Sequence, residues 1–274
     1  MNYRHAYHAG NFADVLKHAV LCWVVRYLQQ KEAPLALIDT HAGPGFYDLE
    51  GLEAQKTAEA KDGIMRLAAR TDAPAALAPY LETVRALNGE GPLRRYPGSP
   101  ALFARMARPI DRVVACELHP EDGEALRASA AGNVRVVLGD GYRTLPSLIP
   151  PPEKRGVVLI DPPFEAPDEF EHLARSFIAA HRKWPTGVFV LWFPIKDRPA
   201  ADRFAAELAS AAIPKLTRMA LDVDRTEGLG ATGLVLCNAP FTLAAEWSEL
   251  LAWLASVLAQ GPNAKAAIEQ LTRS

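Results

Sequence analysis

The four residues Asp161 to Phe164, which read DPPF, are the stretch whose side chains most directly suggest chemistry. They follow the apolar run GVVLI and so lie at the end of an expected β-strand. Because both prolines fix φ and lack an N–H, a carboxylate, the Pro162 carbonyl and an aromatic ring can point into one pocket. Two such acceptors bind the N–H groups of a planar amine, localise its lone pair and lower the barrier to attack on an electrophile. The simpler alternative is a strand that stops at Pro-Pro.

Three further expected strands end in a carboxylate: Asp39 in DTHAGPG, Glu117 in ACELHP and Asp140 in GDGYRTL. In nucleoside-binding α/β folds the second strand supplies an acid that accepts the ribose hydroxyls. Asp140 could accept an adenine amine beside Gly141, although an Asp-Gly turn explains that pair equally well. No phosphate-binding Lys-Ser/Thr motif accompanies these acids, so the sequence predicts a pocket for a nucleoside without a triphosphate.

The glycine-rich turn DTHAGPG would let the backbone at Gly43 approach a ligand closely, although a tight structural turn is an equal alternative. From Gly45 to Glu117 there are 72 residues, against the ~20 of an uninterrupted nucleoside-binding unit. An insertion explains the difference. It makes SPALFARMA the first crossover helix, with Ser99 expected at the N-cap and Pro100 at the first helical position, facing the cofactor pocket.

Alternation of apolar runs with helical patterns predicts an α/β fold with a mainly parallel, Rossmann-like sheet that binds ligands at the carboxyl ends of its strands. The runs are LALIDTHAG, RVVACELHP, VRVVLGDG, GVVLIDPPF and GVFVLWFP. The segments KLTRMALDVD and ATGLVLCNAPF are joined by a short loop and predict an antiparallel pair near the C-terminus, followed by the helix LAAEWSELLAWLASVLAQ.

Residues 46–98 break this alternation and are expected to form an inserted helical subdomain. KTAEAKDGIMRLAAR and AALAPYLETVRALN read as two successive amphipathic helices without a strand between them. Residues 1–45 and 99–274 would then form the main domain. Within it, FADVLKHAVLCWVVRYLQQ predicts a helix that is apolar almost all round and therefore packed under other elements.

Composition favours a cytoplasmic protein of 274 residues with no membrane span, because no apolar run approaches ~18 to 20 residues. Cys22, Cys116 and Cys237 are expected to be reduced core thiols. The net charge of -2 removes the simplest argument for a nucleic-acid partner. It does not exclude one, because binding a phosphate backbone needs only a local basic surface, and the first thirty residues lean positive.

The opening segment YRHAYHAGNFADVLKH holds three histidines, His5, His8 and His18. A metal site is unpromising, because no cysteine and no obvious third ligand accompany His5 and His8. We interpret residues 1–18 as a lid over the cofactor and substrate, in which His5 and His8 form hydrogen bonds. Such a lid should gain hydrogen-exchange protection when both ligands bind.

The motif DPPF resembles the signature [DNS]-P-P-[YFW] of S-adenosylmethionine-dependent amino-methyltransferases. Read in order, YRHAYHAGNFADVLKH, DTHAGPG, RYPGSP, ELHP and IDPPFE resemble the RlmJ family over essentially the whole chain, including the insertion and LWFPI. That family methylates the exocyclic N6 amine of an adenine in 23S ribosomal RNA. The resemblance implies a class I methyltransferase fold, S-adenosylmethionine as cofactor, 23S ribosomal RNA as partner, and a monomer without an obligate protein partner.

The resemblance also implies roles for individual residues of this sequence. The catalytic group would be Asp161, Pro162 and Phe164, which stands where many relatives carry tyrosine and loses only a hydroxyl. The resemblance gives as cofactor contacts His18, His41, Ser99, Glu117, Asp140 and Gly141, to which the glycine-rich turn adds Asp39 and Gly43. It gives Tyr3 as a substrate contact, and from the residues themselves we also expect Arg4, Lys17 and Phe164 to contact the substrate, with no metal ligands.

Two alternatives remain open. The same motif serves amino-methyltransferases that act on DNA adenine or cytosine or on protein glutamine. A non-catalytic, cofactor-binding RNA assembly factor is the second, although the intact Asp161 argues against a degenerate enzyme.

Overall fold

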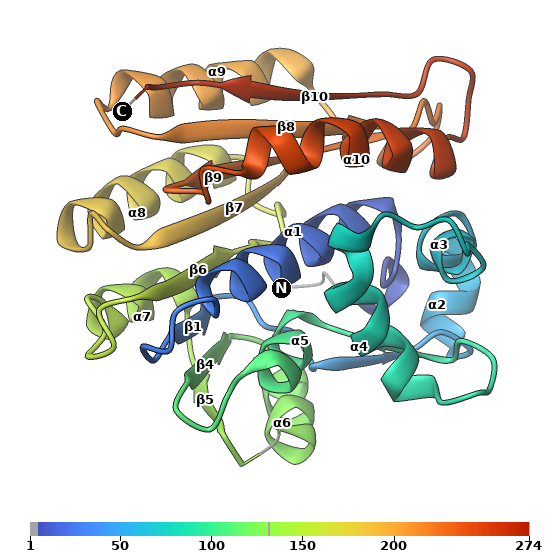
Figure 1. Ribbon diagram of the computed structural model, residues 1–274, viewed down its shortest axis with the longest axis horizontal. Helices are drawn as coiled ribbons and strands as arrows, with labels where there is room; N and C mark the ends of the chain where they lie inside the picture. Colours follow the sequence, from blue (N-terminus) through green and yellow to red (C-terminus); the bar gives the residue numbers. More distant parts are fainter. Residues whose placement is uncertain (1–4, 131, 274) are drawn as a thin grey trace.

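The computed structural model describes residues 5–130 and 132–273, and in this part of the chain it shows one sheet of eight strands with helices on both faces (Figure 1). The strand order is β10-β8-β9-β7-β6-β1-β4-β5. Five central strands are parallel, as predicted: β1 (Ala36–Asp39), β4 (Arg112–Glu117), β5 (Val134–Leu138), β6 (Gly156–Ile160) and β7 (Val188–Pro194). The α/β, Rossmann-like fold class is confirmed.

The C-terminal strands complete the sheet. β9 (Ala231–Cys237) runs antiparallel to both β7 and β8 (Leu216–Asp222), which confirms the predicted antiparallel pair. After α10 (Leu243–Val257), the chain adds the edge strand β10 (Lys265–Gln270), paired antiparallel to β8. The sequence analysis did not predict β10, because its residues alternate between exposed and half-buried and form no apolar run.

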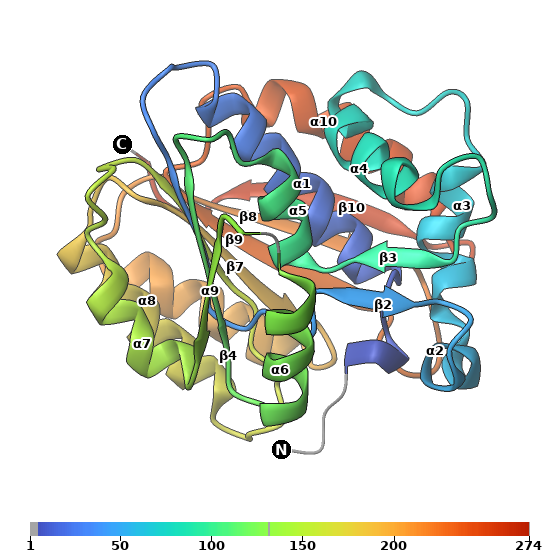
Figure 2. The same cartoon turned by 90° about the horizontal axis from the view of Figure 1, so that it is seen from below.

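Helices cover the two faces of the sheet in separate groups (Figures 1 and 2). One face carries α7 (Gly141–Leu148), α8 (Glu169–Lys183) and α9 (Arg198–Ser210). The other carries α1 (Phe12–Leu28), α5 (Ser99–Met106), α6 (Pro120–Ser129) and α10.

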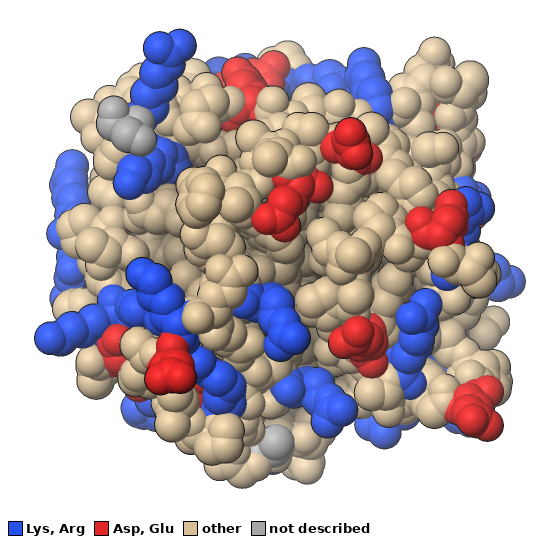
Figure 3. Space-filling view, in the orientation of Figure 1, with Lys and Arg blue, Asp and Glu red and all other residues tan. Residues whose placement is uncertain are grey.

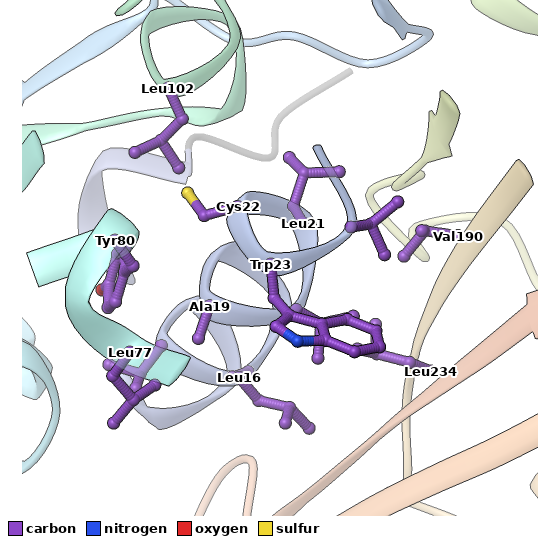
Figure 4. Close-up of a cluster of buried hydrophobic side chains, with 14 of the residues drawn as sticks. Leu16, Ala19, Leu21, Cys22, Trp23, Leu77, Tyr80, Leu102, Val190 and Leu234 are labelled. Atoms are coloured by element: carbon purple, nitrogen blue, oxygen red, sulfur yellow. The ribbon is translucent and has the colours of Figure 1, made fainter. Parts of the chain in front are cut away.

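Helix α1 is buried from Phe12 to Val25, as its apolar pattern predicted. Figure 4 shows why: its side chains face Leu77 and Tyr80 of the insertion on one side and Val190 and Leu234 of the sheet on the other. Its position between two layers leaves α1 almost no solvent face.

The insertion is closed at its base by a two-stranded antiparallel ribbon, β2 (Phe46–Asp48) and β3 (Arg95–Pro97), which was not predicted. Between these strands lie α2 (Leu52–Thr57), the 3-10 turns η2 (Glu59–Asp62) and η3 (Ala75–Leu77), α3 (Ile64–Ala68) and α4 (Ala78–Asn88). The division of the chain into two units at residues 46 and 98 stays a prediction.

The first helix expected in the insertion is broken, so that prediction was wrong. Ala58 adopts a left-handed φ of 53°, and Gly63 packs directly against the backbone of the N-terminal segment. A Cβ at Gly63 would lie 2.0 Å from the Gly10 carbonyl oxygen, which accepts the Ile64 N–H at 2.8 Å. This tertiary contact overrides the helical periodicity.

The start of α5 also differs from the prediction. Gly98, not Ser99, is the N-cap, and its carbonyl accepts the Leu102 N–H at 3.1 Å. The Gly98 N–H donates to the Gly45 carbonyl at 2.8 Å, and this approach holds the two ends of the insertion together. Ser99 is therefore the first helical residue and Pro100 the second.

The three cysteines are buried and free, as expected. Among the residues described, we find no helix with the length and apolar character that crossing a membrane requires. On the face shown in Figure 3, basic and acidic side chains are both spread out, with Lys and Arg more frequent along the left and lower edges.

Candidate active site

A pocket of about 450 Å³ opens at the carboxyl ends of the parallel strands, beside the start of α1. Its size falls within the range of small-molecule sites. Most of the residues predicted to form the site line this pocket: Lys17, His18, His41, Gly43, Ser99, Glu117, Asp161, Pro162 and Phe164. Residues from α1, α5 and the ends of β1, β4 and β6 thus meet at one place, although they span most of the chain.

Three predicted cofactor residues do not line the pocket. Asp39 is fully buried behind it. Asp140 caps α7, accepting the Tyr142 N–H at 2.8 Å. Gly141 allows α7 to pack on β1, since a Cβ there would lie 1.9 Å from the Thr40 carbonyl oxygen. Their contacts with a cofactor stay predictions.

Tyr3 and Arg4, predicted to contact substrate, lie outside the described residues.

The candidate catalytic carboxylate is held by a buried ammonium. Lys17 Nζ lies 2.5 Å from Asp161 Oδ2 and 2.9 Å from Asp14 Oδ1. Burial opposes the charge on Lys17, yet the two carboxylates outweigh it and raise the pKa of Lys17 above its ordinary value. Burial likewise opposes ionisation of Asp14, but His5 and Lys17 hold its pKa well below the ordinary value.

This arrangement gives Lys17 a role other than the predicted contact with substrate. Its side chain is 3% exposed and bonded to two carboxylates, so its ammonium is not presented to a phosphate group. Lys17 holds Asp161 in position through this ion pair, and its contact with substrate stays a prediction. Asp14 was missed by the sequence analysis, although its spacing of three residues from Lys17 on a helix was a usable signal.

The N-terminal histidines form hydrogen bonds, as expected. His5 Nε2 donates to Asp14 at 2.9 Å, and His8 Nδ1 lies 3.0 Å from Glu59 Oε2. Glu59 comes from the insertion and had no signal in the sequence. No cluster of three metal-ligating side chains occurs among residues 5–130 and 132–273.

The structure narrows the proposed lid. Residues from Phe12 onward form the first turns of the buried helix α1. A segment that opens to admit ligands must therefore end before Phe12.

The DPPF motif forms a stiff corner after β6. Phe164 has a φ of +50°, a left-handed conformation that is uncommon for a bulky residue and concentrates at functional sites. Its ring lies edge-on to Phe170 at 4.9 Å and to Trp192 at 5.8 Å between centroids. Trp192 lies in the LWFPI segment of β7 and lines the pocket, and the centre of its ring is 5.7 Å from Lys17 Nζ. It is a site residue that the sequence analysis did not assign.

Glu117, at the end of β4, presents a preoriented carboxylate to the pocket. Glu117 accepts the Gly43 N–H and the His119 N–H, each at 2.7 Å, one on each oxygen. Each oxygen keeps a further lone pair, so the group can accept two hydroxyls. Gly43 has a φ of +62°, and a Cβ there would lie 2.5 Å from Tyr47 Oη, so the turn forms a cradle that only glycine allows.

Burial keeps two histidines of the pocket neutral. It lowers the pKa of His18 to about 3 and that of His41 to about 4. Burial also raises the pKa of Asp39 to about 7, and Asp39 Oδ2 is an unpartnered buried atom. The pocket thus offers a diol acceptor and neutral imidazole groups, with the Asp39 carboxylate buried behind it. These groups fit a nucleoside that carries an amino-acid tail.

This fold, with the DPPF corner facing a nucleoside pocket, defines a class I S-adenosylmethionine-dependent methyltransferase. Residues 32–271 match the family described as "Ribosomal RNA large subunit methyltransferase D, RlmJ". The chain belongs to the RlmJ family, which confirms the resemblance drawn from the motifs.

Individual relatives agree with this membership. The chain is 36% identical to "Ribosomal RNA large subunit methyltransferase J" of Escherichia coli (strain K12), with 94% of each chain covered. It is also 36% identical to the Haemophilus influenzae protein of the same name, with 99% of each covered. A crystal structure of a Legionella pneumophila protein is similar, with a TM-score of 0.89, 32% identity, and coverage of 96% of this chain and 98% of that one.

Asp39→Asn should change how the stability of the free protein depends on pH. The folded-state pKa of Asp39 is raised to about 7 from 3.8, so the folded state binds more protons and wild-type stability falls as pH rises between these values. Asparagine keeps the acceptor for the His41 N–H but cannot ionise. The difference in unfolding free energy between the variant and the wild type should therefore grow in favour of the variant as the pH rises from 3.8 to about 7. The growth should reach a few kcal/mol, on the order of 1.4 kcal/mol per pKa unit, and the difference should stay level at higher pH.

Urea unfolding of both proteins over this pH range measures the difference. A difference that does not vary with pH would show that Asp39 titrates normally.

Proposed function

We propose that this protein transfers a methyl group from S-adenosylmethionine to the exocyclic N6 amine of an adenine in 23S ribosomal RNA. The observation that carries the proposal is the Asp161–Phe164 corner, which lines the pocket and is paired with Lys17 through Asp161. Family membership supports ribosomal RNA as the substrate, and the printed names of the two relatives specify the large subunit.

The bound cofactor supplies an electrophilic methyl group, and the protein supplies the environment of the nucleophile. Asp161 and Pro162 both line the pocket, which supports a role in which the Asp161 carboxylate and the Pro162 carbonyl accept the two N–H groups of the target amine. As the amine nitrogen forms its new bond to carbon, it gains positive charge. Asp161 stabilises that charge and is positioned to take the proton, while Lys17 keeps the carboxylate from turning away.

The remaining groups hold the two ligands. Glu117, at the end of β4 in the same pocket as Asp161, can accept the ribose hydroxyls of the cofactor. Phe164 offers a face for the target base, and its own position is fixed by Phe170 and Trp192. We propose a monomer, as the family resemblance implies, and a cytoplasmic enzyme on the basis of its ribosomal RNA substrate.

Asp161→Ala should retain cofactor affinity and lose turnover. The carboxylate contacts the target amine and not the cofactor, so kcat should fall roughly 10²- to 10⁴-fold while the Kd for S-adenosylmethionine stays near the wild-type value. Asp168→Ala is the matched control, because that carboxylate is exposed and contacts only His172. Methylation by Asp161→Ala at the wild-type rate would refute the mechanism.

Phe164→Ala should weaken binding of the target base. Stacking of a base on an aromatic ring contributes ~1 to 3 kcal/mol, which predicts a rise mainly in KM for RNA. Phe241→Ala removes a ring that is 87% exposed and serves as the control. Steady-state kinetics that show unchanged KM and kcat for Phe164→Ala would mean that the ring does not stack on the base.

The choice of substrate is tested by offering the enzyme and labelled cofactor to ribosomal RNA, DNA and release-factor protein in parallel. The proposal predicts label in the RNA, released by nuclease digestion as N6-methyladenosine. Label only in protein or only in DNA would favour the other amino-methyltransferases. Cofactor binding without label in any substrate would favour the assembly factor.

A further inference from the structure

A chain of three buried aromatic residues connects the pocket to the insertion. His18 Nδ1 lies 2.8 Å from Tyr96 Oη, and Tyr96 Oη lies 2.9 Å from Tyr80 Oη. The His18 and Tyr96 rings are stacked at 5.6 Å. His18 belongs to α1 and lines the pocket, whereas Tyr96 and Tyr80 belong to β3 and α4 of the insertion, and Figure 4 shows Tyr80 turned toward α1.

The position of each proton in this series of three side chains follows from the last hydroxyl, that of Tyr80. Burial raises the pKa of both tyrosines well above the ordinary value, so both hydroxyls carry a proton, and His18 is neutral. Among the residues the structure describes, Tyr96 is the hydrogen-bond partner of the Tyr80 hydroxyl, and no other is found. A buried hydroxyl that donates to nothing is costly. Tyr80 therefore donates to Tyr96.

The remaining protons are then determined. Because the Tyr96 oxygen accepts from Tyr80, its own O–H donates to His18 Nδ1. The single proton of the neutral imidazole must reside on Nε2. Nε2 has no partner within the described chain, and His18 lines the pocket. The two tyrosines thus turn His18 into a neutral N–H donor that is available to a ligand.

Ser99 lies on the same pocket, at the first position of α5. The free backbone N–H groups of a first helical turn favour negative charge, which adds to the donor of His18. Among the nearby anions, Asp14 and Asp161 are already bonded to Lys17, and burial raises the pKa of Asp39 to about 7, which reduces its negative charge at neutral pH. This side of the pocket therefore suits a carboxylate better than an ammonium.

We propose that Tyr80 and Tyr96 are positioning residues that set the Nε2–H tautomer of His18, so that His18 donates to the α-carboxylate of the cofactor's amino-acid tail. This inference rests on the proposed function, because it takes S-adenosylmethionine as the cofactor. It gives the insertion a part in cofactor binding through two buried residues that do not themselves line the pocket.

Binding measurements on Tyr96→Phe test whether this series of hydrogen bonds from Tyr80 through Tyr96 to His18, here called the relay, supports cofactor binding. The ligands are S-adenosylhomocysteine and its decarboxylated analogue, which lacks only the α-carboxylate. Tyr96→Phe should raise the Kd for S-adenosylhomocysteine about tenfold, or about 1.4 kcal/mol, and leave the Kd for the analogue unchanged. Tyr80→Phe should act in the same direction with a smaller effect, because Tyr96 can still donate to His18. Tyr27→Phe, at the far end of α1, is the control and should change neither Kd.

A second measurement reads the tautomer directly. Nitrogen-15 spectra of labelled histidine should show His18 protonated on Nε2 in the wild type and a share of Nδ1-protonated ring in Tyr96→Phe. If Tyr96→Phe does not fold, Tyr80→Phe carries both measurements.

The outcomes separate this inference from the proposed function. A wild type that binds S-adenosylhomocysteine but carries its His18 proton on Nδ1 would overturn the relay alone. So would a Tyr96→Phe variant that loses affinity equally for both ligands, or for neither. A wild type that binds neither ligand would overturn the proposed function as well.

Discussion

The ion pair between Lys17 and Asp161, completed by Asp14, is the interaction on which the rest of the site depends. It joins the first turns of α1 to the corner after β6, across 144 residues of sequence. Buried charges are expensive to desolvate, and removing one partner leaves the others uncompensated. The ion pair holds one carboxylate at a defined point, and that carboxylate, Asp161, is the one proposed to accept the target amine.

The surroundings of this ion pair explain features that otherwise look unrelated. Helix α1 is apolar almost all round because it packs between the sheet and the insertion, and Asp14, Lys17 and His18 are its buried polar residues. Asp14 also accepts bonds from His5 and from the Gly10 N–H, so the N-terminal segment folds back onto the same group. Through Glu59 the insertion holds His8 and Asn11 of that segment. The insertion therefore contributes to the pocket in two ways: Glu59 holds the N-terminal segment beside it, and Tyr96 holds His18.

The sequence predicted best what is encoded locally. A buried parallel strand ending in Asp, Glu or Gly is visible as an apolar run, so the five central strands and the position of Asp161 were predicted. Contacts between distant segments were not visible. The helix break at Gly63 depends on the Gly10 carbonyl, and the cap of α5 depends on Gly45 meeting Gly98. Strand β10 lacks an apolar run because it lies at the edge of the sheet. Lys17 was assigned to the substrate because nothing in the sequence shows that two carboxylates enclose it.

The central claim is that this protein places a methyl group on the N6 amine of one adenine in 23S ribosomal RNA. The most direct test is to map N6-methyladenosine by mass spectrometry in ribosomal RNA from cells with and without the gene, and from deletion cells supplied with either the wild-type gene or the Asp161→Asn variant. The account predicts one modified adenine in 23S ribosomal RNA that disappears on deletion and returns with the wild-type gene but not with the variant. An unchanged methylation pattern in the deletion cells, or restoration by Asp161→Asn, would contradict it.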